Sequence, residues 1–109
     1  MGALVILFLL ESLLFVGVSL PLIRRRVRPN PLYGFRTSKT LGDSEIWYKA
    51  NEYAGRGLLW TGLVFGVAAL GLALVPGVST ATYAWGCLAV LLLSLGATTL
   101  SSFRYLNTL

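Results

Sequence analysis

Three long apolar stretches dominate this sequence and restrict what it can fold into. They cover residues 3–23, 58–75 and 83–103, and a polar segment follows each of the first two. An α-helix rises 1.5 Å per residue, so about 20 apolar residues cross a hydrocarbon layer of about 30 Å. Inside lipid the backbone must satisfy its own hydrogen bonds, which a helix does. The sequence therefore predicts an all-α integral membrane protein with three transmembrane helices.

The low content of charged residues supports a membrane location. Charged residues make up 12% of the 109 residues, whereas a soluble domain usually has about 25%. A chain this short has too few polar residues here to cover a hydrophobic core with a water-soluble surface. It is also too short for two large domains. We therefore predict a single membrane domain over residues 1–109.

The charged residues are concentrated between the first and second apolar stretches. Eight of the nine basic residues and three of the four acidic residues lie at positions 24–56. Basic segments next to spans stay on the cytoplasmic side, where they face anionic lipids. This rule places the N-terminus outside and the C-terminus inside, with Arg104 as a second inner charge. It predicts anionic membrane lipids as partners and argues against nucleic-acid binding.

The segment 24–57 is predicted to be a cytoplasmic loop followed by an amphipathic helix. Proline and glycine disfavour a helix in its first part, at positions 29, 31, 34 and 42. Asp43 is a suitable N-cap for a helix over residues 44–57, in which apolar and charged residues fall on opposite faces. We expect this helix to lie in the membrane interface, although it can equally continue into the second span.

The sequence lacks the residues that many catalytic and metal sites need. It has no histidine, and its single cysteine, Cys87, lies in an apolar stretch. Histidine-based zinc sites and catalytic triads are therefore excluded within this chain. The few carboxylates form no pattern typical of a metal site or an acid–base pair. We expect no catalytic residues, no metal and no cofactor, and a protein that is not an enzyme.

Glu11 is the one ionisable residue predicted to lie well inside a span. It falls roughly 12 Å below the outer interface at the helical rise per residue. A carboxylate in lipid is unfavourable and usually faces the protein interior. Ser94 on the third span has a similar depth, and we expect it to be the hydrogen-bond partner. Glu11 is either a packing residue, a proton- or cation-responsive site, or a contact to a partner subunit.

Small residues recur along the second and third spans. Gly62 and Gly66 form a GxxxG pattern, and Ser94, Thr98 and Ser102 repeat at intervals of four residues. Such faces allow helices to approach closely in a membrane, and hydroxyl groups can hydrogen-bond across them. The pattern indicates either internal packing of the three helices or contact with a second copy or another protein.

The most specific pattern lies in the loop and the helix that follows. Its candidate site residues are Asn30, Gly34, Arg36, Thr37, Asp43, Trp47 and Asn51. Gly34 permits a positive φ, and Arg36 offers a planar guanidinium to a carboxylate, phosphate or carbonyl group. Asp43 can pair with Arg36, and the two asparagines can tie the loop backbone to the helix. The group forms either a self-satisfied cap or a dock for a ligand or peptide.

The same residues resemble the signature of the SdpI family of small bacterial membrane proteins, over positions 30–55. The resemblance implies a multi-pass protein of the bacterial cell membrane. The family includes an immunity protein that protects a toxin-producing cell and recruits a transcriptional repressor to the membrane. It thus implies that this chain protects against, or senses, an antimicrobial peptide by binding a partner through its cytoplasmic motif.

Two other functions stay open at the level of sequence. One is a small oligomeric proton-coupled transporter or channel that uses Glu11, because length and a membrane glutamate resemble the small multidrug resistance exporters. Those exporters have four spans, whereas three are predicted here. The other is an accessory subunit of a larger membrane complex, which the small size and the small-residue helix faces favour.

Overall fold

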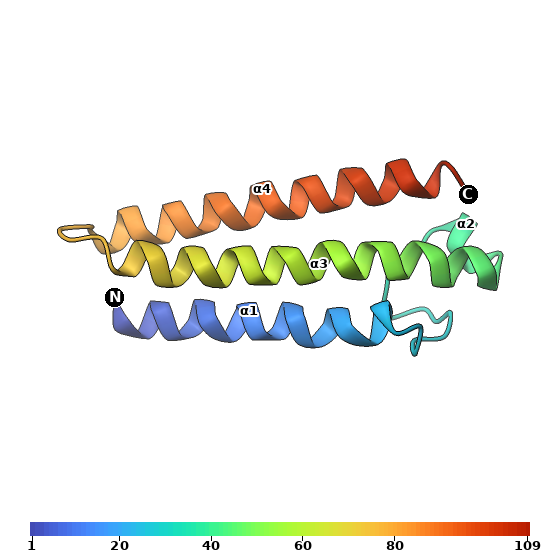
Figure 1. Cartoon of the computed structure of the whole chain (residues 1–109), viewed down its shortest axis with the longest axis horizontal. Coiled ribbons are helices and arrows are strands. Elements are labelled where there is room, and N and C mark those ends of the chain that lie inside the picture. The colour runs from blue at the N-terminus through green and yellow to red at the C-terminus, as the bar shows by residue number, and fades with distance from the viewer.

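The computed structural model describes all of residues 1–109 and is entirely helical. Its elements are α1 (Gly2–Ile23), α2 (Ser38–Leu41), α3 (Ser44–Ala73) and α4 (Thr80–Leu106). The three long helices lie side by side, and α2 lies at one end of them (Figure 1). All three are long and apolar enough to cross a membrane. This confirms the all-α class and the three spans.

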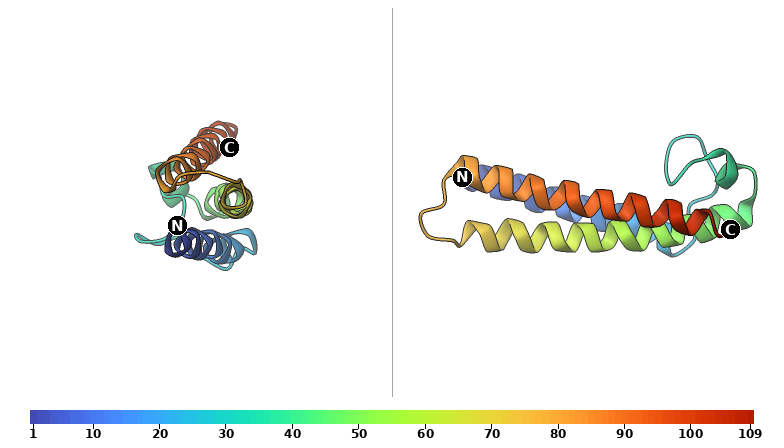
Figure 2. Two further views of the ribbon diagram at one scale, coloured as in Figure 1. Left: turned by 90° about the vertical axis from the view of Figure 1, so that its left-hand side faces the viewer. Right: turned by 90° about the horizontal axis from the view of Figure 1, so that it is seen from above.

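α3 is the central helix of the bundle. α1 and α4 pack mainly against α3 rather than against each other. Both run in the opposite direction to α3, as the end-on and side views show (Figure 2). Residues 24–56 therefore gather at one end of the bundle, together with the C-terminus (Figure 1). We call this the charged end and the opposite end the far end.

The amphipathic helix predicted over residues 44–57 is not a separate interfacial element. It is the first part of α3, which continues unbroken through the second span. A Cβ atom on Gly55 would lie 3.0 Å from Leu22 Cβ of α1, and one on Gly57 would lie 2.5 Å from Thr98 Cγ2 of α4. These glycines let both outer helices approach α3. α3 is continuous through both glycines, and α1 and α4 pack closely against it there.

Two further boundaries differ from the sequence prediction, and each difference has a capping side chain as its cause. The loop contains the single turn α2, which Thr37 caps by accepting a hydrogen bond from the Thr40 backbone N. α4 starts at Thr80, ahead of the predicted residue 83, because Ser79 Oγ accepts from Thr82 N at 3.1 Å. N-cap side chains of this kind satisfy free backbone N–H groups at a helix start.

A small aromatic core lies toward the far end. Tyr83 is fully buried and donates to the Ala69 carbonyl at 2.8 Å. The ring of Phe8 from α1 stacks on Tyr83 at 5.8 Å and meets Phe65 of α3 at 5.4 Å. The phenol of Tyr83 has a partner within the bundle, which allows this side chain to be buried.

The small residues on α3 pack against α1. Ser12 Oγ donates to the Gly62 carbonyl at 2.6 Å, and a Cβ atom on Gly66 would lie 2.6 Å from the same hydroxyl. On the other side, Thr61 and Thr98 hydroxyls are 3.1 Å apart between α3 and α4. These contacts support the internal-packing interpretation of the GxxxG pattern.

Candidate functional site

Trp47 fixes the loop to the start of α3 at the charged end. Its side chain is fully buried, with an exposed fraction of 0%, and its indole N–H donates to the Val27 carbonyl at 2.8 Å. A buried indole needs such an acceptor. Trp47, on the apolar face predicted for residues 44–57, is therefore covered by the chain's own loop.

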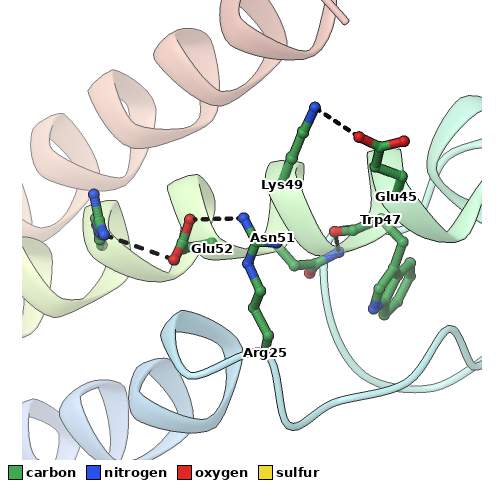
Figure 3. A network of polar contacts seen from close by, with 7 residues as sticks. Arg25, Glu45, Trp47, Lys49, Asn51 and Glu52 are labelled. Atoms are coloured by element: carbon green, nitrogen blue, oxygen red, sulfur yellow. Dashed lines mark hydrogen bonds and ion pairs between the residues drawn. The ribbon is translucent and has the colours of Figure 1, made fainter.

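Asn51 ties the loop backbone to α3, as the sequence predicts. Its Oδ1 accepts from the Phe35 N–H at 2.6 Å, and its Nδ2 donates to the carbonyls of Phe35 at 3.3 Å and Trp47 at 3.0 Å. The contact between Asn51 and Trp47 lies along one face of α3 (Figure 3). One amide thus pairs both backbone polar groups of a loop residue.

Gly34 adopts the left-handed backbone conformation that the sequence allows, with φ of 114°. A Cβ atom there would lie 2.8 Å from Asn51 Oδ1 and 3.0 Å from the Trp47 ring. Both the torsion and the close approach require glycine. Gly34, Trp47 and Asn51 therefore form one packed unit, which we call the loop lock.

Asn30 acts within the loop and not between loop and helix, so that part of the prediction is wrong. Its Oδ1 accepts from the backbone N atoms of Leu32 and Tyr33 at 2.9 and 2.7 Å. Its Nδ2 donates to the carbonyls of Arg28 and Tyr33 at 2.7 and 3.0 Å. Short asparagine side chains commonly satisfy nearby backbone in this way, so the loop stabilises its own turn.

The loop and α2 also contact both outer helices. The Tyr33 hydroxyl donates to the Val18 carbonyl of α1, and burial raises the pKa of Tyr33, so the phenol keeps its proton at neutral pH. Lys39 Nζ donates to the Leu106 carbonyl at the end of α4 at 3.0 Å. The charged end is therefore joined to all three spans.

Thr37 and Asp43 are helix caps. Asp43 Oδ1 accepts from the N atoms of Glu45 and Ile46 at 2.9 and 3.3 Å, which confirms its predicted capping role. It does not pair with Arg36, which instead donates to the Pro31 carbonyl. Thr40 was not among the candidate site residues. It is fully buried, and the Thr37-x-x-Thr40 spacing of a capping box could have indicated it.

The outer surface of the charged end carries a network of ion pairs on α3 (Figure 3). Glu52 accepts a hydrogen bond from Arg25 at 3.3 Å and forms an ion pair with Arg56 at 3.7 Å, and Glu45 pairs with Lys49 at 3.0 Å. The pairs Glu45–Lys49 and Glu52–Arg56 lie within α3 at the i, i+4 spacing. Exposed pairs of this kind contribute little to stability.

Four arginines at the charged end are exposed and have no acidic partner, and the most exposed apolar side chain of the loop lies beside them. The arginines are Arg24, Arg26, Arg28 and Arg36. The apolar side chain is Leu32, with an exposed fraction of 89%. The loop lock points inward, and this surface, which we call the arginine surface, points outward. Signature residues such as Trp47 and Asn51 therefore hold the loop, while Arg24, Arg26, Arg28 and Leu32 are exposed for contact. Arg36 belongs to both groups, because it is exposed and donates to the Pro31 carbonyl.

Glu11 and Ser94 lie away from this site and are not joined by a hydrogen bond. Glu11 is half-buried on α1. The hydrogen bonds from α4 to α3 come from Tyr83 and Thr98 instead of Ser94. A functional role for Glu11 or Ser94 stays a prediction. No group of three or more His, Cys, Asp or Glu side chains is close enough to hold a metal ion.

Three spanning helices and a loop locked onto the central one define a small multi-pass membrane protein. The model of the SdpI/YfhL protein family matches residues 26–102, which include the charged end, α3 and most of α4. The chain belongs to the SdpI/YfhL family, as the resemblance over residues 30–55 predicts. No curated protein sequence and no solved structure matches the chain.

Proposed function

We propose that this protein is a non-enzymatic immunity or sensing protein of the bacterial cell membrane. It protects the cell against, or senses, an antimicrobial peptide, and it acts by binding a protein or peptide partner at its charged end. Family membership supports the general role. The observation that carries the proposal is the division of the charged end into an inward loop lock and an outward arginine surface.

The charged end is proposed to face the cytoplasm. Arg104 in the last turn of α4 lies at the same end of the bundle as the basic segment that follows α1. Lysine and arginine near span ends favour the cytoplasmic side, and both groups favour the same orientation. The N-terminus is then outside, and exposed arginines lie near anionic headgroups.

The arginine surface favours a partner that carries carboxylates next to an apolar side chain. Guanidinium groups form paired hydrogen bonds with carboxylates, and such contacts are stronger than those of neutral groups. Leu32 adds an apolar contact on the same loop, because its side chain is largely exposed. A loop fixed by Trp47 and Asn51 presents these groups with little loss of conformational freedom on binding.

A genetic and a biochemical experiment test this function together. Deleting the gene in its source bacterium should raise sensitivity to that bacterium's own antimicrobial peptides, and restoring the gene should reverse the effect. Unchanged sensitivity to every such peptide would contradict an immunity role. Purification from native membranes in mild detergent, followed by mass spectrometry, should then recover the partner.

The variant Leu32→Ser probes the arginine surface without altering the arginines that set orientation. It should reduce partner recovery several-fold at equal expression. The matched control is Lys49→Gln, which also lies at the charged end but is paired with Glu45. Equal recovery with both variants would argue against this surface as the contact.

A further inference from the structure

A cavity of about 280 Å³ lies among the three spanning helices just inside the charged end. Its walls include Leu22 of α1, Leu58 of α3 and Ser102 of α4, and Gly34 and Phe35 of the loop close it. The ring of Phe35 meets Phe103 of α4 edge-on, with centroids 5.0 Å apart and an interplanar angle of 72°. The loop that carries the family signature is thus one wall of the cavity.

Ser102 provides the polar group of this cavity. Its exposed fraction is 4%, and its Oγ is the one buried side-chain nitrogen or oxygen atom with no hydrogen-bond partner in the protein. Two neighbouring hydroxyls are paired: Ser101 donates to the Ala97 carbonyl at 2.6 Å, and Thr98 donates to the Gly57 carbonyl at 3.2 Å. Thr99 also lines the cavity, but it is exposed. Buried hydroxyls are nearly always paired, so Ser102 points to a ligand that offers an acceptor.

The cavity has a defined depth relative to the basic residues. On each span, one residue that lines the cavity is two positions closer to the middle of the span than an arginine. Two residues correspond to about 3 Å along a helix axis. These pairs are Leu22 with Arg24, Leu58 with Arg56, and Ser102 with Arg104. Arginines at span ends lie at the level of the lipid phosphates. The level just inside them is that of the ester carbonyl groups of the lipids.

The size of the cavity also limits its occupant. At about 30 Å³ for each atom of the size of a water molecule, it holds on the order of nine non-hydrogen atoms. This is too small for a whole lipid or for an amphipathic helix. It is enough for one ester group and the first methylene groups of a chain. The walls are mainly apolar, which suits methylene groups.

We propose that this cavity binds the ester end of one acyl chain of a membrane glycerophospholipid, and that Ser102 Oγ–H donates a hydrogen bond to the ester carbonyl. The bound chain fills the space between α1 and α4 and packs against Phe35. It thereby holds α4 and the loop in one arrangement. This inference does not depend on which partner the arginine surface binds.

The test compares two lipids that differ only at the proposed contact. Full-length protein in mild detergent is titrated with palmitoyl-oleoyl phosphatidylglycerol or with its diether analogue, which has the same headgroup but no ester carbonyl. Native mass spectrometry measures the fraction of protein with one bound lipid. The diester should bind about fivefold more tightly, as expected for one additional hydrogen bond. Equal binding of the two lipids by the unmodified protein would overturn the proposal.

Two variants and a control locate the contact. Ser102→Ala should remove the preference for the diester, and Ser102→Leu should fill the cavity and abolish the one-lipid species. Ser101→Ala removes the adjacent hydroxyl, which has its own carbonyl partner, and should keep the fivefold preference. A diester preference that persists in Ser102→Ala would overturn the proposal. Because the diester and diether lipids are compared on the unmodified protein, the test stands even where Ser102→Leu fails to fold.

Discussion

Asn51 forms hydrogen bonds with both backbone polar groups of Phe35, accepting from its N–H at 2.6 Å and donating to its carbonyl at 3.3 Å. A loop residue normally pairs these groups with water or with neighbouring backbone. Here a single buried amide on α3 contacts both groups, and Thr40 Oγ1 also donates to the carbonyl at 3.0 Å. The conformation of the loop is therefore tied to the register of α3.

Replacing this amide by a carboxylate should loosen the loop. Asn51→Asp keeps the size and the acceptor but cannot donate to the carbonyls of Phe35 and Trp47. It also places a charge at a site with an exposed fraction of 2%. We expect the free energy of unfolding to fall by about 1–3 kcal/mol, measured by denaturation in mixed micelles. An exposed control, Glu45→Gln, should change it by less than about 0.5 kcal/mol.

Adding a methyl group at Gly34 should open the loop lock. Gly34→Ala imposes a positive φ on alanine and a clash with Asn51 Oδ1. We expect trypsin to cleave at Arg36 and Lys39 at least several-fold faster, with intact-mass spectrometry as the readout. Gly96→Ala is the matched control, because a Cβ atom there meets nothing within 4 Å. Equal cleavage rates in the two variants would contradict the lock.

The contact between Ser12 and Gly66 gives a prediction about helix packing. Gly66→Ala should destabilise the pair α1–α3 by about 1–2 kcal/mol, because its Cβ would lie 2.6 Å from Ser12 Oγ. Adding Ser12→Ala removes that oxygen and should restore part of the loss. A double-mutant cycle in detergent measures this coupling. Additive effects would instead favour the use of this face for contact between copies.

Glu11 distinguishes the proposed function from the transporter alternative. The half-buried carboxylate has no ion-pair partner, so a proton-coupled role is chemically feasible. If the immunity role holds, purified protein in liposomes containing a pH-sensitive dye should carry no proton flux above that of empty liposomes. Glu11→Gln should then also protect cells as well as the unmodified protein does. A flux that disappears in Glu11→Gln would instead support the transporter.

Hydropathy and charge were sufficient to predict the class and the three spans, and the residue type at position 43 was sufficient to predict the cap at Asp43. They were not sufficient for features that depend on packing between distant segments. The continuity of α3 follows from Gly55 and Gly57 meeting side chains of two other helices. The burial of Tyr83 follows from a carbonyl that α3 provides. Both contacts join residues that are far apart in the sequence, so the residues next to Gly55, Gly57 or Tyr83 do not indicate them.

Two kinds of polar contact at the site were predictable: a cap formed with neighbouring backbone, and an asparagine side chain that pairs with the backbone of the loop. Asp43 caps the helix that begins beside it, and Asn51 reaches the loop as expected. The pairing of Asp43 with Arg36 was wrong because each side chain finds a nearer backbone partner. Ser102 belongs to the repeat with Ser94 and Thr98, but nothing in that repeat indicated that the Ser102 hydroxyl would be buried without a partner.

The central place of α3 has a consequence for the order of assembly during synthesis. α1 is made first, but its main partner is made later, so Ser12 stays without the Gly62 carbonyl until α3 has entered the bilayer. A lone serine in a lipid-exposed helix then bonds to its own backbone. α4 is made after both of its neighbours, so it docks on a surface that the pair α1–α3 provides.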